Sequence, residues 1–335
     1  ADAVGAVGAG DAAGDAMGEG CEVALCASAA PVVCASSTLT TTASRTYPGL
    51  ARICLIITLC ALAPLGGTPA CAQPQPSPSP APQKDPCGGP SRLLATANRP
   101  TVGFSTCAVA KHTAVFELGY QNTVFGTPQE GSVESQVPQN FLRIGVADRV
   151  EFDVIGPNYE GVRTYGPGTP GTTLHGVDDS GLGFKYELPP SARWTVAFDG
   201  LYTGPNGSEH LTAGNATITG NLDASYTMSP ASSIGTTIAV SSTGGFAGDE
   251  HFQYGVTMPS LVMTTQIPNF YQFYAEYVLQ SKVSPHQGAR SFTDFGVQKL
   301  LGTRTEIDLE YGHAFTGIDA LKFNYIGAGM VFQLW

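Results

Sequence analysis

Residues 305–335 read TEIDLEYGHAFTGIDALKFNYIGAGMVFQLW, two alternating segments around a short break at residues 318–321. Successive side chains of a β-strand point to opposite faces of its sheet. In the first segment the apolar and acidic residues therefore lie on opposite faces: Ile307, Leu309 and Tyr311 on one, Glu306, Asp308 and Glu310 on the other. The stretch predicts a β-hairpin with one apolar face and one polar face.

The composition narrows the class of protein. Only 13% of the 335 residues are charged, whereas soluble domains carry about 25%. The formal net charge of −11 argues against nucleic acid as a partner, because phosphate backbones attract basic surfaces. No uninterrupted apolar run reaches the roughly 18 residues of a membrane-spanning helix. With 41 Gly, 16 Phe and 13 Tyr, this composition favours alternating β-strands.

The N-terminal region has the features of a leader. Residues 1–44 are rich in Ala, Gly, Ser and Thr without periodicity, so we expect them to be disordered or to lie upstream of the true start. Residues 45–72 have the layout of a signal peptide, with Arg residues before an apolar run and small residues before a cleavage site after Ala72. A lipoprotein anchored at Cys71 is the alternative.

The remainder of the sequence, from His112 onward, contains strand-like runs bounded by turn residues. We expect twelve: Thr113–Val124, Ser135–Val146, Val150–Gly156, Gly181–Leu188, Arg193–Gly204, Thr217–Ser229, Ser233–Thr243, Phe252–Ile267, Phe270–Val283, Ser291–Leu301, Thr305–Gly317 and Lys322–Trp335. Every second connection is short, and all the others except the last are longer, up to the loop at Pro157–Ser180. Short periplasmic turns, longer external loops and an even strand number are typical of outer-membrane barrels.

The sequence therefore predicts an all-β fold, an antiparallel up-and-down transmembrane β-barrel of about twelve strands over residues 112–335. Both of its ends would lie on the periplasmic side. The last run would pair with the first and close the barrel. Pro259 interrupts the eighth run and predicts a bulge or a register change there.

Two segments separate the leader from this barrel. Residues 73–84 are a Pro-rich linker, extended and solvated. Residues 85–111 form an N-terminal segment that we place in the periplasm. Cys87 and Cys107 lie within it, and thiols of exported chains are normally oxidised. A disulfide that ties this segment to the barrel rim is favoured over two free thiols.

Alternation assigns a set of polar residues to the barrel lumen. The predicted lumen-lining residues are Glu117, Gln121, Arg143, Glu151, Asp153, Lys185, Glu187, Asp199, Asp223, Gln272, Glu276, Asp294, Asp308 and Glu310. Acidic residues dominate this set, so a water-filled pore would prefer cations or neutral solutes. The alternative is a closed lumen in which Arg143 and Lys185 pair with the carboxylates. A barrel of this width is compatible with both.

Several of these stretches carry a family resemblance. They are NRPTVGFSTCAV (98–109), HTAVFELGY (112–120), QNFLRIGVADRVEFDV (139–154), DDSGLGFKYEL (178–188), DFGVQKLLGTRTEIDLEYGHAFTG (294–317) and YIGAGMVFQL (325–334). Over about residues 98–335 the sequence resembles the outer-membrane transporters of the meta-pathway of phenol degradation. The resemblance implies a Gram-negative outer-membrane barrel that moves small molecules, aromatic compounds among them.

The resemblance also implies how the chain reaches its membrane. The terminal strand, with Phe332, Leu334 and Trp335, would be the signal for insertion by the barrel-assembly machinery. Outer-membrane lipid would surround a monomeric barrel. The resemblance assigns no residue to ligand contact, so the transported solute stays open.

Two alternatives to a passive channel remain. A structural or surface-display barrel would have its lumen filled by side chains or by the N-terminal segment. An outer-membrane lipid hydrolase would need His and Ser on one wall, and the nearest candidates, His175, Asp178, Asp179 and Ser180, lie in a loop. The acidic pairs Asp178–Asp179 and Asp249–Glu250 lack an EF-hand spacing. We therefore predict no catalytic residue, no metal site and no cofactor.

Overall fold

The computed structural model describes residues 86–89, 91–167, 171–191, 193–247, 250–284, 287–316 and 322–335. The chain divides into two units, residues 1–75 and 76–335, and the described residues belong to the second. The disordered segment, the signal peptide and the Pro-rich linker predicted for residues 1–84 lie outside them. No helix among the described residues is long and apolar enough to cross a membrane.

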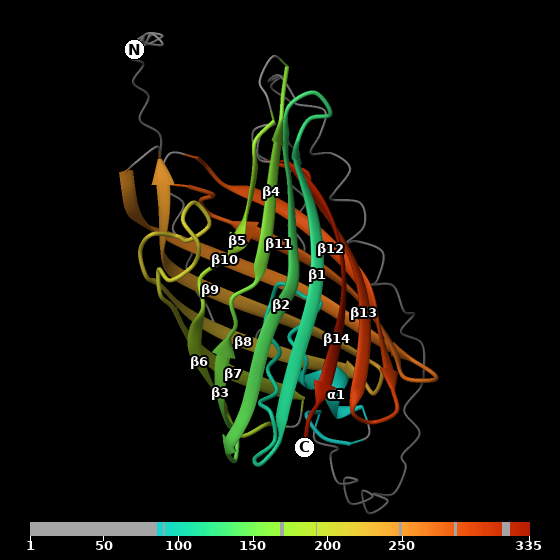
Figure 1. Cartoon of the computed structure of the whole chain (residues 1–335). Helices are drawn as coiled ribbons and strands as arrows, with labels where there is room; N and C mark the ends of the chain where they lie inside the picture. The colour runs from blue at the N-terminus through green and yellow to red at the C-terminus, as the bar shows by residue number, and fades with distance from the viewer. Residues whose placement is uncertain are drawn as a thin grey trace, which may run out of the picture. The chain divides into compact units, whose positions relative to one another are not determined.

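Antiparallel β-strands build the second unit (Figure 1). They are β1 (Ala114–Gly126), β2 (Gly131–Ala147), β3 (Val150–Ile155), β4 (Tyr159–Tyr165), β5 (Thr173–Val177), β6 (Gly181–Glu187), β7 (Trp194–Thr203), β8 (Thr217–Ser229), β9 (Ser232–Ala247), β10 (Glu250–Ile267), β11 (Tyr271–Gln280), β12 (Arg290–Leu301), β13 (Thr305–Ala314) and β14 (Phe323–Gln333). All except β4 and β5 form a closed ring, β1–β2–β3–β6–β7–β8–β9–β10–β11–β12–β13–β14–β1. The predicted twelve-stranded antiparallel barrel is confirmed.

The pairing of β1 with β14 closes the ring. Its register runs from Val115 opposite Gln333 to Phe125 opposite Phe323. The predicted pairing of the last run with the first is therefore confirmed. Because β14 ends where β1 begins, we call this end of the barrel the C-terminal end and the other the far end.

The long connection predicted at Pro157–Ser180 contains a hairpin, β4–β5. The first half of β2, up to Gln136, pairs with β4, whereas β2 from Phe141 onward pairs with β3. The hairpin thus extends the barrel wall beyond β3 at the far end. The segments YEGVRTY and TLHGV are short, and each is interrupted by a Gly, so the sequence pattern did not identify them as strands.

Two other connections that we predicted to be long are short. β1 continues to Gly126 and β2 begins at Gly131, while β9 continues to Ala247 and β10 begins at Glu250. The apolar alternation fades before these strands end, but backbone pairing continues along them. Hydrophobic pattern therefore underestimates strands that extend beyond an apolar zone.

The bulge predicted at Pro259 is wrong. The register of β9 with β10 passes through the pair Pro259–Ile238 without a shift. On the other side the ladder with β11 begins only at Ser260, and Thr257 exchanges hydrogen bonds with Ser281 there. Pro259 is two residues from Thr257, so its backbone nitrogen points toward β11 and not toward β9. The N–H that proline lacks therefore removes no hydrogen bond to β9.

The two faces of the barrel wall are of opposite chemistry. Large apolar side chains are exposed on the outside, such as Leu309 (61%), Phe184 (56%) and Ile326 (56%). Charged side chains are buried on the inside, with Arg143 and Lys185 at 0% exposure. This is the reverse of a soluble barrel and is the arrangement that suits a lipid-facing wall.

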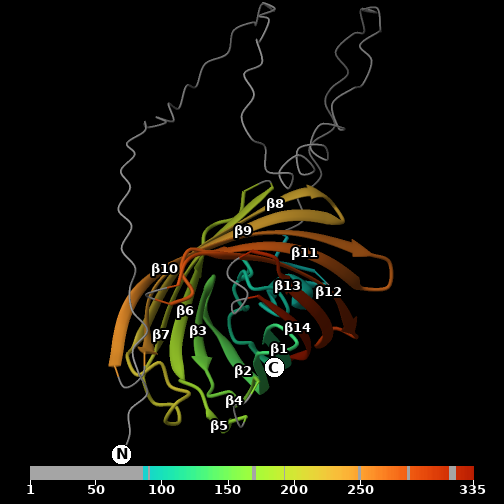
Figure 2. The same cartoon turned by 90° about the horizontal axis from the view of Figure 1, so that it is seen from above.

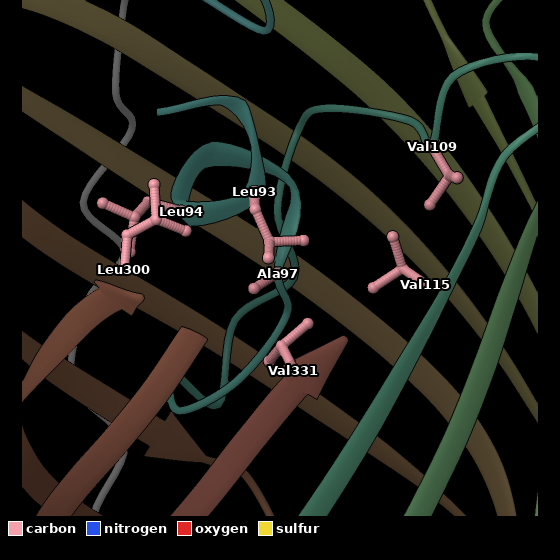
Figure 3. Close-up of a cluster of buried hydrophobic side chains, with 7 residues drawn as sticks. All are labelled: Leu93, Leu94, Ala97, Val109, Val115, Leu300 and Val331. Carbon is pink, nitrogen blue, oxygen red and sulfur yellow. The ribbon is translucent and has the colours of Figure 1, made fainter. Parts of the chain in front are cut away.

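A short helix, α1 (Arg92–Thr96), lies at the C-terminal end of the ring (Figure 1). Apolar side chains of the helix and of the chain after it pack with the starts and ends of wall strands; together they are Leu93, Leu94, Ala97, Val109, Val115, Leu300 and Val331 (Figure 3). Cys87 and Cys107 form a disulfide with an S–S distance of 2.05 Å. The predicted disulfide is therefore present, but it joins two residues of the N-terminal segment, and the apolar packing is what anchors this segment to the barrel.

The outward apolar face makes a prediction about Leu309, in the middle of β13. Leu309→Arg should lower the free energy of unfolding in phospholipid vesicles by about 2–4 kcal/mol, because a cation at the bilayer midplane loses its hydration. The matched change Leu301→Arg, at the end of β12, should cost about 0–1 kcal/mol. Urea titration of both variants measures the difference, and equal costs would contradict a lipid-facing band.

Candidate functional site in the barrel lumen

A stretch of non-strand chain, residues 98–109, lies inside the ring of strands (Figure 2). We call it the lumenal segment. The sequence interpretation placed residues 85–111 outside the barrel, whereas the backbone of the lumenal segment is hydrogen-bonded to inward side chains of opposite walls. A segment without a ladder of its own must find partners for its backbone N–H groups, and the wall supplies them.

Two glutamates each accept a pair of consecutive backbone N–H groups. Glu117 of β1 accepts from Asn98 at 3.1 Å and from Arg99 at 3.0 Å. Glu276 of β11 accepts from Val102 at 2.8 Å and from Gly103 at 2.9 Å. Two such hydrogen bonds offset part of the desolvation of each buried carboxyl group.

Further wall residues bind the second half of the lumenal segment. Thr237 of β9 accepts from the backbone of Phe104 at 3.0 Å, and Glu187 of β6 accepts from that of Ala108 at 2.9 Å. Glu151 of β3 accepts from Val109 N–H at 2.7 Å. The lumenal segment is therefore fastened to strands all around the ring.

Arg143 of β2 binds both wall carboxylates and a backbone carbonyl of the lumenal segment. Its guanidinium lies 3.0 Å from Glu117 Oε1 and 2.9 Å from Glu151 Oε1. It also donates to the carbonyl oxygens of Thr96 and Cys107. Its hydrogen bonds to two carboxylates and two carbonyls offset its desolvation.

Arg99 of the lumenal segment forms ion pairs with carboxylates of the wall. Its Nη2 lies 3.2 Å from both Asp308 Oδ1 and Glu310 Oε1, and Nη1 donates to Gln139 Oε1 at 2.6 Å. Burial acts to lower the pKa of the guanidinium, but the carboxylates of Asp308 and Glu310 keep it above its usual value. Arg99 is therefore a fixed cation between the walls.

Lys185 of β6 is the third buried cation. Its ammonium lies 3.4 Å from Asp199 Oδ1 and donates to the carbonyl oxygen of Ser105. It also lies 5.5 Å from the ring centroid of Phe104, a cation–π distance. Asp223 accepts from the hydroxyl of Thr237 beside this group.

All the residues predicted to line the lumen lie on the inner face. Those that contact the lumenal segment directly are Glu117, Arg143, Glu151, Lys185, Glu187, Glu276, Asp308 and Glu310. The others bind wall residues or line the space beside it: Gln121, Asp153, Asp199, Asp223, Gln272 and Asp294.

Sequence reasoning missed other residues of this site. Glu306 is fully buried, although the predicted lumen-lining set omits it and the alternation places it on the polar face with Asp308 and Glu310. Gln298 is also buried and donates to the Arg99 carbonyl oxygen at 3.0 Å. Arg99 itself carried no signal, because residues outside strands show no periodicity.

Among the described residues, two cavities beside the lumenal segment both have Arg99 in their lining. The larger, of about 400 Å³, reaches the far end of the barrel and is lined by residues that include Phe125, Glu134, Arg290, Phe323 and Tyr325. The smaller, of about 330 Å³, is lined by Phe104, Phe141, Ile155 and Leu201 together with polar groups. The ion pairs and the lumenal segment therefore fill part of the lumen, and the two cavities lie beside them.

The loop residues considered for hydrolysis have other partners. Asp178 accepts from the backbone and side chain of Asn158, and Asp179 accepts from Gly207 and Ala213 N–H, both at 2.8 Å. His175 stacks on Tyr159, with ring centroids 6.3 Å apart. These residues hold the loops around the β4–β5 hairpin. Asp249 lies outside the described residues.

The Arg143 cluster predicts a large effect on stability. Arg143→Met should lower the free energy of unfolding by about 3–5 kcal/mol, because Glu117 and Glu151 would stay buried without their cation. Arg163→Met, at an exposed position of β4, is the matched control and should change it little. Urea unfolding followed by electrophoretic heat-modifiability measures both, and a neutral Arg143→Met would contradict the assigned role.

Comparison with known proteins bears on the fold. No family model matches the sequence, and no curated protein matches it. Among solved structures, the chain is similar to the COG4313 outer membrane channel from Pseudomonas putida F1, with a TM-score of 0.52 and 11% identity over 68% of this chain and 97% of that one. For the NanC porin the TM-score is 0.45, with 14% identity over 65% of this chain and 100% of that one. The likeness to the COG4313 channel shows that this fold is one used by outer-membrane channels.

Proposed function

We propose that the chain is an outer-membrane β-barrel that acts as a passive channel for small molecules. The observation that carries this proposal is the pair of cavities, of about 400 and about 330 Å³, enclosed by a barrel with an apolar outer face. Cavities of this size accommodate small organic molecules. The lumenal segment would then control passage between them and the C-terminal end.

Aromatic compounds are the solutes that we propose for this channel. The larger cavity is lined by four aromatic rings, those of Phe125, Phe292, Phe323 and Tyr325. The centroids of the other three rings lie 5.2–5.9 Å from that of Phe323, in tilted and edge-on contacts. The resemblance to the phenol meta-pathway transporters supports the same class.

A non-transporting barrel is the second candidate. It is favoured by one observation, that the lumenal segment crosses the lumen and is bound to walls all around it. Such a barrel would be structural or would display the β4–β5 hairpin at the cell surface.

Location and assembly follow from the same proposal. The signal peptide at residues 45–72 would direct export to the outer membrane of a Gram-negative bacterium, as a monomer in lipid. The terminal residues Phe332, Leu334 and Trp335 would be read by the barrel-assembly machinery. Leu334 and Trp335 are exposed, and Leu334 N–H donates to the Ala114 carbonyl oxygen at 2.9 Å.

Loosening the lumenal segment should open the channel. Glu276→Gln removes the charge that accepts two backbone N–H groups, so the single-channel conductance in planar bilayers should rise above that of the unmodified protein. Asp294→Asn is the matched control. Asp294 is opposite Glu276 in the β11–β12 register but binds Tyr325 rather than the lumenal segment.

The two candidate functions give different recordings. A channel predicts solute flux into liposomes and a conductance that Glu276→Gln increases more than Asp294→Asn does. Absence of conductance and flux in all three proteins, each folded by heat-modifiability, would leave the non-transporting barrel.

A further inference from the structure

Two opposite charges line the larger cavity without pairing with each other. Arg290 projects from β12 and Glu134 from β2, with β13, β14 and β1 between them in the ring. In the part of the chain that the structure describes, no salt bridge joins either residue to another charge. The buried cations deeper in the lumen all have carboxylate partners, so this separation is specific to the cavity.

The guanidinium of Arg290 is held in a defined orientation. Its Nε donates to Gln280 Oε1 at 2.8 Å, and its Cζ lies 4.8 Å from the Phe323 ring centroid. The ring contact and the Nε bond fix the plane of the guanidinium, and neither Nη group donates a hydrogen bond to another residue in the part of the chain that the structure describes. A fork of donors is therefore available to an anion.

The acidic side of the cavity is built from β2 and its partner β4. Glu134 Oε1 accepts from Gln136 Nε2 at 3.1 Å. Glu160 is opposite Gln136 in the β2–β4 register, so it faces inward beside Glu134. This side attracts cations, as the Arg290 side attracts anions.

Aromatic side chains cover the wall between the two charges. Phe125 of β1 and Phe323 of β14 are cross-strand partners with ring centroids 5.6 Å apart. Phe292 packs edge-on against Phe323 at 5.2 Å. Arg290 and Glu134 thus face one cavity that also has an aromatic surface.

We infer that this cavity binds a small zwitterion that carries an aromatic ring, with its carboxylate at Arg290, its ammonium at the Glu134 side and its ring against the aromatic wall. The inference names a solute class for the proposed channel and so rests on that function. A hydrocarbon in this cavity would displace water from Arg290 and Glu134 and would offer neither residue a hydrogen bond or an opposite charge. A zwitterion supplies a partner to each.

Three probes of matched shape test this arrangement. L-Phenylalanine carries both charges, 3-phenylpropanoate lacks the ammonium, and 2-phenylethylamine lacks the carboxylate. In isothermal titration with the detergent-solubilised full chain, L-phenylalanine should bind at least about tenfold tighter than either analogue, because each analogue leaves one charged side of the cavity without its partner.

Two variants test which residue of the cavity binds the carboxylate of the probes and which binds the ammonium. Arg290→Gln should weaken L-phenylalanine and 3-phenylpropanoate roughly tenfold and leave 2-phenylethylamine unchanged, whereas Glu134→Gln should weaken L-phenylalanine and 2-phenylethylamine. Arg163→Gln, on the exposed face of β4, is the control and should bind all three probes as the unmodified protein does. Heat-modifiability verifies that each variant is folded.

Equal affinity for the three probes, or L-phenylalanine binding that neither variant alters, would overturn the inference. This failure is distinguishable from that of the channel. Conductance without preference for L-phenylalanine leaves the channel and removes the zwitterion site. Binding of L-phenylalanine with the predicted losses, but without conductance, leaves the site and removes transport.

Discussion

Carboxylates inside a narrow barrel stay charged only if hydrogen-bond donors or cations reach them, because an unpaired charge is costly away from water. The wall of this barrel carries many more buried carboxylates than cations. Glu117, Glu151, Glu187 and Glu276 obtain donors from the backbone of residues 98–109. The lumenal segment has no β-ladder, so its backbone N–H groups find their acceptors in these carboxylates. Each side therefore supplies the hydrogen-bond partners of the other.

Glycines of the wall make room for the lumenal segment. A side chain at Gly119 or Gly329, on the neighbouring strands β1 and β14, would overlap the guanidinium of Arg99. A side chain at Gly103 would meet Glu276, Ser260 and Thr237. Glycines therefore stand where wall and segment approach most closely, and this shows that the two surfaces fit together at specific positions.

Charge pairing divides the lumen into two zones. Around Arg143, Lys185 and Arg99 each cation has carboxylate partners, and this zone joins the barrel to the lumenal segment. Toward the far end, Arg290 and Glu134 face a cavity with aromatic walls. The paired zone supports the structure, and the unpaired zone is where a solute can replace water. A channel and a plugged barrel share the first zone and differ in whether the lumenal segment moves.

The sequence by itself determined the ring. Alternation over residues 112–335 identified the strands, the face of nearly every inward charge and the closure of β14 on β1, because strand geometry forces side chains to alternate. It could not show the β4–β5 hairpin or the full length of β9 and β10, where the apolar pattern fades but backbone pairing continues. Only the tertiary structure decided that the lumen is occupied. Residues 98–109 have no period, and their partners, such as Glu276 and Asp308, lie far along the chain, so their place depended on which wall groups the closed ring brought within hydrogen-bond reach.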